Sequence, residues 1–265
     1  MRIGVIGLGA VGSAIKSGFE KLNHTVLVHD IKMQTQVKDV LDSEIIFVCV
    51  PTPQDYDGSC DTSIIVSVFE ELKQTNYKGI VAIKSTVECG FTQSMIDRYK
   101  ELTVCFVPEF LRERCAEHDF VDNHQLLAVG TDDPFIYNKI IEAHGTYPKH
   151  TVRLKPTEAE ILKYYNNVFA ATKIIFANIM SELCDKTGCD YSKIKNAFVK
   201  TGKAVDMYLD VNENLKGYGG MCLPKDVRAM NKLLQKNGVD FNMLDAIDKD
   251  NNKLKITVFN GMRKK

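Results

Sequence analysis

The sequence lacks several features that would assign it to a specialised class of protein. It contains 34 Lys+Arg and 34 Asp+Glu residues, so its net charge is zero and does not favour a nucleic-acid partner. No apolar run is long enough to span a bilayer, and the glycine-broken N-terminus does not resemble the continuous apolar core of a signal peptide. We therefore expect a cytoplasmic protein that acts away from membranes and nucleic acids.

Paired cysteines and metal-ligand spacings are missing as well. The eight cysteines include no CxxC pair, and Cys49, Cys105 and Cys184 lie in apolar runs. That usage is typical of reduced thiols that mostly serve packing. The six histidines show no spacing typical of a metal site, and we expect no bound metal.

The first half of the chain instead alternates short β-branched runs with segments of helical length. The runs predict strands at Arg2–Ile6, Thr25–His29, Ile45–Val50, Ile80–Lys84, Val104–Val107 and Leu126–Val129. The segments between them predict helices near Val11–Leu22, Ile64–Gln74, Gln93–Lys100 and Pro134–His144. Such alternation favours an α/β fold with a doubly wound, parallel sheet of the Rossmann type.

The second half has no strand signal after about residue 155 and predicts an all-α domain. A long central helix should begin at Pro156 and end at Gly188, followed by a helix at Tyr191–Val199 and two more after Pro224. The long helix carries apolar or small residues on two opposite sides, so we expect it to be a buried spine or a dimer seam. The predicted domains are residues 1–154 and 155–265.

The segment "GVIGLGAVG" indicates a dinucleotide site. Gly7, Gly9 and Gly12 form G-x-G-x-x-G between a predicted strand and a helix, where glycine permits the tight turn, the approach of a pyrophosphate and close helix–strand packing. The helix N-terminus would then offer free N–H groups to the phosphates. Asp30 at the end of the second strand suits a ribose diol, which favours NAD over NADP.

The segment "LKGYGGMCLPKD" places one thiol on a glycine hinge. Pro224 suits the start of a helix, which puts Cys222 just before a helix N-terminus and close to Lys225. The helix dipole and the ammonium both favour the thiolate, the reactive form of cysteine. The alternative is a packing cysteine beside a glycine turn, as we expect for most of the other seven.

Together these motifs resemble the nucleotide-sugar dehydrogenases, the UDP-glucose and GDP-mannose 6-dehydrogenase family. The resemblance rests on "GVIGLGAVG" with Asp30, "VPTP", "KSTV", "PEFLRE", "EAEILKYYNN" and "GYGGMCLPKD", which occur in the family's order. It implies oxidation of a sugar's C6 alcohol to a carboxylate by two NAD⁺ in two hydride transfers, with UDP-glucose as the favoured substrate. The expected intermediates are a thiohemiacetal and a thioester on Cys222.

The resemblance also implies a role for each site residue. The implied catalytic residues are Cys222, Lys163, Asn167, Asp226, Glu109 and Thr86. The implied cofactor-binding residues are Gly7, Gly9, Val11, Gly12, Asp30, Pro51, Thr52, Ser85, Thr86, Glu113 and Lys225. The implied substrate-binding residues are Phe110, Leu111, Arg112, Lys163, Asn167, Tyr218 and Gly219. On any surface helix, Lys163 and Asn167 could equally be a solvated pair.

Two other functions stay open at this point. One is a single-hydride hydroxyacid dehydrogenase that uses Lys163 and Asn167 without a nucleophilic cysteine. The other is a non-catalytic NAD-binding relative that has lost its substrate domain. The resemblance further implies a homodimer through the long helix. Because relatives carry a third, nucleotide-sugar-binding domain, we expect this chain to be a short form without it.

Overall fold

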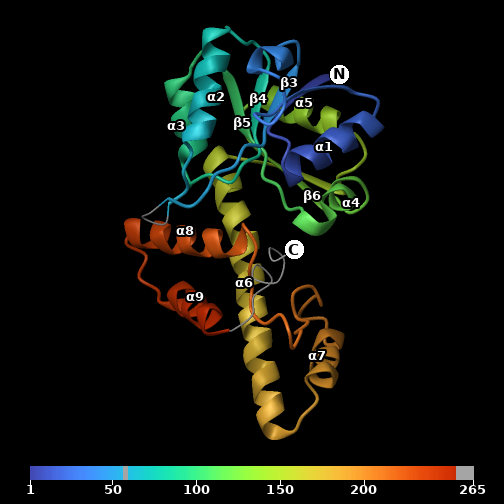
Figure 1. The fold of residues 1–265 in the computed structure, drawn as a ribbon, viewed down its shortest axis with the longest axis vertical. Helices are drawn as coiled ribbons and strands as arrows, with labels where there is room; N and C mark the ends of the chain where they lie inside the picture. Colours follow the sequence, from blue (N-terminus) through green and yellow to red (C-terminus); the bar gives the residue numbers. More distant parts are fainter. Residues whose placement is uncertain (56–58, 255–265) are drawn as a thin grey trace. The chain divides into compact units, whose positions relative to one another are not determined.

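The computed structural model describes residues 1–55 and 59–254, which divide into two compact units (Figure 1). Unit 1 comprises Met1–Asp55 and Cys60–Lys163. Unit 2 is formed chiefly by Tyr164 and the described residues after it. The boundary falls inside one long helix, and each unit is described here by itself.

Unit 1 is built on a 7-stranded sheet with the order β2-β1-β3-β4-β5-β6-β7. Neighbouring strands from β2 to β5 run parallel, as in the register Ile3↔Ile45 between β1 and β3. Such a sheet, in which β1 lies between β2 and β3 and the strands are joined by helical crossovers, is a Rossmann-type fold. The strands are β1 (Arg2–Ile6), β2 (Thr25–His29), β3 (Ile45–Val48), β4 (Ile80–Ile83), β5 (Thr103–Phe106), β6 (Leu126–Gly130) and β7 (His150–Leu154).

Helices cover both faces of this sheet (Figure 1). One face packs on α2 and α3, and the other packs on α1, α4 and α5. Alternate residues of each strand serve the two faces: Ile46 and Val48 belong to the first core, whereas Ile45 and Phe47 belong to the second. The helices are α1 (Ala10–Lys21), α2 (Ser63–Gln74), α3 (Phe91–Arg98), α4 (Ala116–Val121) and α5 (Pro134–His144), with 3₁₀ turns at Val37–Val40 and Glu113–Cys115.

The Rossmann-type α/β fold is confirmed, with one correction to the direction of its strands. Instead of a wholly parallel sheet, β6 pairs antiparallel with β5 at Phe106↔Gly130 and parallel with β7. The only α-helix between β5 and β6, both fully described, is the 6-residue α4, which follows the 3₁₀ turn Glu113–Cys115. A helix of that length spans about 9 Å and cannot carry the chain back along a strand, as a parallel crossover requires.

The predicted elements lie within a few residues of the observed ones, but two observed elements were missed. The edge strand β7 (His150–Leu154) has no apolar run, and α4 is too short for a helical period to stand out. Helix α3 begins at Phe91, ahead of the predicted Gln93, because Gly90 ends the preceding loop in a left-handed conformation with φ 89°.

Unit 2 is helical. Helix α6 (Pro156–Thr187) begins in unit 1 and ends before Gly188, whose φ is +69° as predicted for a helix C-terminus. It is followed by α7 (Tyr191–Lys200), α8 (Leu223–Lys236) and α9 (Met243–Lys253). Six buried hydrophobic residues from α6, α8, α9 and the loop before α8 form a core cluster: Ala171, Ile175, Tyr218, Val227, Leu244 and Ile247.

The two sides of α6 in unit 2 differ in exposure. Ala170, Ala177 and Ser181 are buried, as expected for one of the two sides. The other side keeps a row of large hydrophobic side chains exposed, with 55% of Phe169, 54% of Phe176 and 54% of Leu183 accessible. The expectation that α6 is buried on both sides therefore does not hold among the described residues of one chain.

Candidate active site

The glycine-rich turn after β1 has the geometry that a dinucleotide site requires. Gly7 has φ +91°, and a Cβ at Gly12 would collide with the carbonyl oxygen of Gly7, so both positions demand glycine. A Cβ at Gly9 would meet nothing within 4 Å, which leaves the backbone open to a ligand. Gly9 is also the N-cap of α1 and provides no side-chain hydrogen bond, so the first N–H groups of the helix remain available around Val11.

Asp30 follows β2 and faces this turn. Its Oδ2 accepts a hydrogen bond from the Leu8 N–H at 2.6 Å, and its Oδ1 accepts one from the Lys32 N–H at 2.8 Å. These two backbone donors, first that of Leu8, hold the pKa of the Asp30 carboxyl below its ordinary value. A fixed carboxylate beside a glycine turn and an uncapped helix N-terminus fits the adenosine ribose and pyrophosphate of a dinucleotide.

The predicted residues after β3 and β4 lie side by side at the carboxyl edge of the sheet. The Thr52 hydroxyl donates to the carbonyl of Thr86 at 2.7 Å, and the Ser85 hydroxyl donates to that of Val50 at 2.6 Å. Pro51 between them is exposed. These bonds join the two loops, and ligands of doubly wound sheets bind at this edge.

Glu109 lies in the loop after β5 and is only 6% exposed. Its Oε2 is 2.8 Å from the Nζ of Lys84, and its Oε1 accepts the Phe110 N–H at 2.9 Å. The Nζ of Lys163 donates to the main-chain carbonyl of Glu109. Two buried lysines from different elements therefore fix this one glutamate.

Asp119, which lies outside the "PEFLRE" segment, holds Arg112 of that segment in place. Asp119 on α4 accepts the Arg112 side chain at two atoms, Nε at 2.9 Å and a terminal nitrogen at 2.6 Å, and also the Arg112 N–H. Hydrogen bonding to Arg112 holds the pKa of Asp119 far below its ordinary value. Phe110 and Leu111 are half-buried, and Glu113 is exposed in the 3₁₀ turn.

Glu160 is a further buried carboxylate in unit 1, on the first turns of α6. It accepts the N–H groups of Gly90 at 2.5 Å and Thr92 at 2.7 Å, and so caps the N-terminus of α3 from another helix. Its exposed fraction is 0% and burial raises the pKa of its carboxyl. This cap anchors the end of the loop that carries Ser85 and Thr86.

In unit 2, Cys222 is the N-cap of α8 and Pro224 lies in the helix's first turn, as the sequence predicted. The cysteine is exposed, on a hinge in which Gly217 has φ +78° and Gly220 has φ +80°. All eight cysteines are free thiols, but their surroundings differ. Burial raises the pKa of Cys49 to about 12, which makes it an inert packing thiol.

The predicted polar residues of unit 2 form one network around Asp226. This carboxylate is 0% exposed; its Oδ2 accepts the Asn167 amide at 2.6 Å and its Oδ1 accepts the Lys225 ammonium at 2.7 Å. The Asp226 N–H donates to the carbonyl of Cys222 at 2.8 Å, within the first turn of α8. The network therefore ties the helix that begins at Cys222 to α6.

The glycine hinge is also held by Asn251 of α9, which the sequence did not single out. Its amide oxygen accepts the Tyr218 N–H at 2.8 Å and its amide nitrogen donates to the Tyr218 carbonyl at 3.0 Å. Tyr218 is 1% exposed, and Gly219 follows it half-buried. A Cβ at Gly217 would lie 2.5 Å from the Asn251 oxygen, so the glycine makes room for this clamp.

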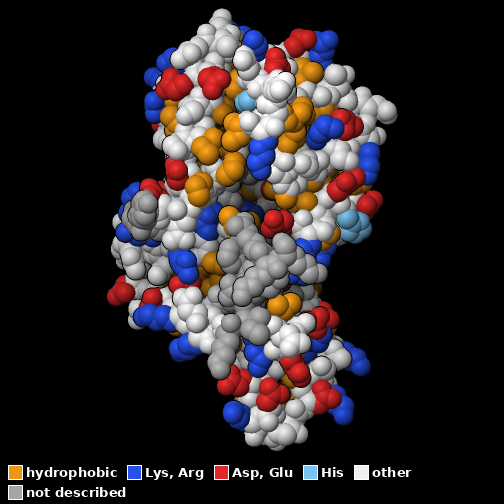
Figure 2. All heavy atoms as spheres, in the orientation of Figure 1, with side chains coloured by type: hydrophobic (Ala, Val, Ile, Leu, Met, Phe, Trp, Pro, Cys, Tyr) orange, Lys and Arg blue, Asp and Glu red, His pale blue; other side chains and the backbone are white. Residues whose placement is uncertain are grey.

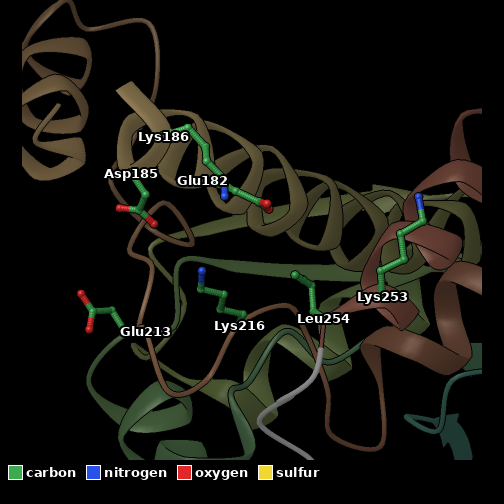
Figure 3. Close-up of a pocket in the computed structure, with 7 residues that line it drawn as sticks. All are labelled: Glu182, Asp185, Lys186, Glu213, Lys216, Lys253 and Leu254. Carbon is green, nitrogen blue, oxygen red and sulfur yellow. The ribbon is translucent and has the colours of Figure 1, made fainter. Parts of the chain in front are cut away.

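A cavity of ≈ 540 Å³ elsewhere in unit 2 includes none of the predicted site residues (Figure 3). Figure 3 shows Lys216 and Leu254 pointing toward the wall formed by the α6 residues. Its lining carries three acidic and three basic side chains with one leucine: Glu182, Asp185, Lys186, Glu213, Lys216, Lys253 and Leu254. The balanced charge gives it no preference for an anionic ligand.

The predicted residues therefore form two groups, one in each unit. The structure adds four residues that hold them and that the sequence did not single out: Lys84, Asp119, Glu160 and Asn251. Lys84 and Glu160 stand inside the quoted motifs "KSTV" and "EAEILKYYNN", so a charged residue within a predicted buried element was an available signal. Asn251 had no such signal.

Two family models match the chain. The NAD binding domain of the UDP-glucose/GDP-mannose dehydrogenase family matches residues 31–144, and the central domain of the same family matches residues 157–253. Together they cover most of both units. Within the described part of the chain, no helix is both long and apolar enough to cross a membrane.

Individual relatives give the same result. The chain is 32% identical to protein MJ1054 of Methanocaldococcus jannaschii over 93% of its own length and 28% of that protein. It is 31% identical to UDP-glucose 6-dehydrogenase of Pseudomonas aeruginosa over 82% of its own length and 50% of that protein. A UDP-glucose dehydrogenase structure from Pyrobaculum islandicum superposes with a TM-score of 0.87 at 25% identity, covering 95% of this chain and 68% of the other.

Proposed function

The chain belongs to the UDP-glucose/GDP-mannose dehydrogenase family, and we propose that it oxidises the C6 alcohol of a nucleotide sugar to a carboxylate. Its cofactor is NAD, for which residues 31–144 match the family's binding domain. The proposal rests chiefly on an exposed thiol at a helix N-terminus in a chain that also has a dinucleotide turn. The chain spans 28% and 50% of the two relatives named above, so the activity and substrate are proposed for this portion of the family's length.

Unit 1 would supply the cofactor site and the acid–base groups. The turn from Gly7 to Gly12 binds the pyrophosphate and Asp30 binds the ribose, whereas Thr52, Ser85 and Thr86 border the nicotinamide end. Bound there, NAD⁺ would supply the hydride acceptor for each oxidation. Lys163 takes the proton of the C6 hydroxyl, and its ammonium then stabilises the negative oxygen of each tetrahedral intermediate.

Unit 2 would supply the nucleophile. After the first oxidation the Cys222 thiolate adds to the aldehyde carbon and forms a thiohemiacetal, which keeps the aldehyde bound. The second oxidation converts the thiohemiacetal into a thioester. Asn167 donates a hydrogen bond to the intermediate's oxygen, while Asp226 orients the Asn167 amide that it already accepts at 2.6 Å.

Hydrolysis of the thioester would complete the reaction. Glu109 accepts a proton from water, the resulting hydroxide attacks the thioester carbon, and the carbon–sulfur bond breaks to release the carboxylate and the Cys222 thiolate. Phe110, Leu111, Arg112, Tyr218 and Gly219 border the sugar in this proposal. The segment "GYGGMCLPKD" resembles members that use glucose- and mannose-type sugars more than those that use N-acetylated ones, and UDP-glucose is the substrate that we favour.

The long helix supports a homodimer as the working form. Its exposed Phe169, Phe176 and Leu183 recur at helical spacing on one side, which is the pattern of a helix that packs on a second helix. We also propose that the functional boundary between the NAD-binding and helical domains lies near residue 155.

The experiment that tests the function measures NADH formed from excess NAD⁺ and limiting UDP-glucose, GDP-mannose or UDP-N-acetylmannosamine. Two NADH per sugar are expected for one of these substrates. Cys222→Ala should form no acid while it still binds NAD, and Cys189→Ala is the matched control because Cys189 is also exposed. One NADH per sugar would point to a single-hydride dehydrogenase. No turnover with NAD bound would point to a non-catalytic relative.

A further inference from the structure

Lys84 of the segment "KSTV" and Glu109 of the segment "PEFLRE" form an ion pair inside unit 1. The resemblance implies a role for Glu109 but none for Lys84. Lys84 directly follows β4 and Glu109 lies in the loop after β5. These neighbouring parallel strands pair Ile83 with Phe106, so their carboxyl ends adjoin. The Lys84 Nζ lies 2.8 Å from Glu109 Oε2 and 3.5 Å from the carbonyl oxygen of Val107.

The buried position of Lys84 makes its positive charge costly for folding, which suggests that the charge serves a function. The Lys84 and Glu109 side chains are 1% and 7% exposed, and the ammonium lies 5.9 Å from the centre of the buried Phe47 ring. Desolvating a charge costs several kcal/mol, and a buried ion pair is often no more stabilising than apolar residues of similar size. Stability alone is therefore a poor reason for a lysine at this place.

The carboxylate keeps one acceptor position unused. Glu109 Oε1 accepts the Phe110 N–H, and the Lys163 ammonium fixes the main-chain carbonyl of the same residue. Lys84 approaches Oε2 at ion-pair distance but not along a hydrogen-bond direction, so among the described residues Oε2 has no aligned donor. Oε2 is buried, but a carboxylate oxygen that keeps an unused lone pair beside a positive charge can take a proton from a water bound with the substrate.

The charged groups around Glu109 favour the ionised form of its carboxyl. Burial is the largest single influence and raises the pKa of Glu109, but the Lys84 ammonium, His124 and the Phe110 N–H together outweigh it, so the pKa of the carboxyl lies below its ordinary value. The other titratable groups around the pair are Lys163, His124, His144 and the thiols of Cys49 and Cys105, whose pKa values are raised by burial so that both thiols are neutral. Burial lowers the pKa of both histidines, which keeps them neutral at physiological pH and leaves Lys84 as the dominant nearby cation besides Lys163.

We propose that Lys84 is the positioning residue for Glu109: it keeps the carboxylate ionised and holds Oε2 in place to take the proton of the hydrolytic water. The proposal deepens the proposed function and rests on it for the identity of the reaction. Lys84 exchanges no proton itself. Water loses a proton to Oε2, its oxygen bonds to the thioester carbon, and the Cys222 thiolate leaves.

The direct test is an NMR titration of carboxyl carbons in the full chain labelled with ¹³Cδ-glutamate, in which Glu109→Gln identifies the Glu109 signal. In the wild type, Glu109 should titrate below the ordinary glutamate pKa of about 4.3. In Lys84→Met, it should move above that value by at least one unit. Lys139→Met is the control, because it removes the lysine partner of the exposed Glu142 in the same unit and should leave Glu109 unchanged.

The kinetic readout separates positioning from general damage. Lys84→Met should still show a burst of NADH, followed by steady turnover at least tenfold slower at pH 6, with the thioester visible as added mass on Cys222. Raising the pH should restore turnover as Glu109 ionises. A structural role alone would lower the burst and the steady rate together and would leave the pH profile in place.

Two further measurements test the proposal if Lys84→Met does not fold or if the wild type oxidises no nucleotide sugar. If Lys84→Met does not fold, the wild-type titration and Lys84→Arg decide: a low Glu109 pKa in both supports the proposal. A wild-type Glu109 that titrates at or above about 4.3, or an unchanged titration in a folded Lys84→Met, overturns it. If no nucleotide sugar is oxidised by the wild type, the proposed function fails, but the titration still settles whether Lys84 controls the Glu109 charge.

Discussion

The two units bury their hydrophobic residues in different ways. In unit 1 the sheet is packed on both faces, and the cores on the two sides contain large, fully buried residues such as Phe69 and Phe47. Figure 2 shows the same unit with hydrophobic side chains gathered in the middle of the visible face and most charged ones nearer its outline. In unit 2 the core cluster has six buried hydrophobic residues, and α7 buries none. The sheet of unit 1 is therefore packed on both faces, whereas α6 of unit 2 keeps large hydrophobic side chains exposed, among them Phe169 and Phe176.

The polar groups follow the same division. Unit 1 places charges inside the protein, where Lys84, Glu109 and Glu160 are all less than 9% exposed. Unit 2 keeps the Cys222 thiol exposed, while the buried Asp226 and Asn251 hold the segments on either side of it. Rigid, desolvated groups suit acid–base chemistry and cofactor positioning, whereas an exposed thiol on a hinge suits attack on an incoming substrate.

The largest expected effect compares one phenylalanine from each unit. Phe69→Ala should lower the free energy of unfolding by about 3–5 kcal/mol, because it empties a space that is 0% exposed in the first core of unit 1. Phe176→Ala, at 54% exposure on α6, should cost less than about 0.5 kcal/mol in a dilute monomer. Urea unfolding at low protein concentration measures both. Equal losses would remove the distinction between the two cores.

The next prediction concerns the partner for the exposed side of α6. The wild type should sediment as a dimer of 29.8 kDa chains. Replacing both Phe169 and Phe176 by Glu should weaken the dimer more than 100-fold, which corresponds to about 2.7 kcal/mol, since four charges would be desolvated in the contact. Ile31→Glu is the control, because Ile31 is 90% exposed in unit 1. A monomeric wild type at micromolar concentration would refute the proposed seam.

The sequence alone predicted those turns and helix ends that are determined by interactions between neighbouring residues. The turn at Gly7 and the end of α6 at Gly188 both need a positive φ, and glycine signals that directly. The helix start at Cys222 is set by Pro224 two residues later. The motif segments were found for the same reason, since each places its functional residues within about ten positions of one another.

The features that the sequence did not predict depend on contacts between residues far apart in the chain. Glu160 caps α3 across 70 residues, and Asn251 holds Tyr218 across 33, so neither partner can be deduced from spacing. The antiparallel direction of β6 depends on how the chain crosses after β5, which no local pattern encodes. The exposed side of α6 was expected to be buried because an apolar stripe predicts a contact without saying whether the same chain supplies it.

A smaller effect is expected from the buried cap in unit 1. Glu160→Ala should lower the free energy of unfolding by about 1–3 kcal/mol, because the Thr92 N–H loses its only acceptor in a buried position. Glu158→Ala is the control: Glu158 lies one half-turn earlier on α6, is exposed and accepts only the Lys155 N–H. Equal losses in the two variants would contradict the role of the cap.

The same residue predicts a pH dependence with a definite sign. Burial raises the Glu160 pKa in the folded state, so between the ordinary glutamate value and that raised value the folded protein binds more protons than the unfolded one. The contribution of Glu160 to stability is therefore greatest at acid pH, falls as pH rises through this window, and is constant above it. Urea unfolding from pH 4 to 8 measures the free energy of unfolding at each pH. The decrease that Glu160 causes should be present in Glu158→Ala and absent from Glu160→Ala.

The smallest predicted effect concerns the clamp on the glycine hinge of unit 2. Asn251→Ala removes both hydrogen bonds to Tyr218 and should cost about 1–2 kcal/mol, less than the loss in the densely packed sheet because the hinge can take up water. Hydrogen exchange at the Tyr218 amide should accelerate about tenfold for each 1.4 kcal/mol lost, while amides of β3 and β4 keep their rates. Asn252→Ala is the matched control, since the exposed Asn252 only makes a 3.4 Å contact with Asp248 on its own helix. If Asn251→Ala left the Tyr218 amide as protected as in the control, the hinge that carries Cys222 would owe its shape to the glycines alone.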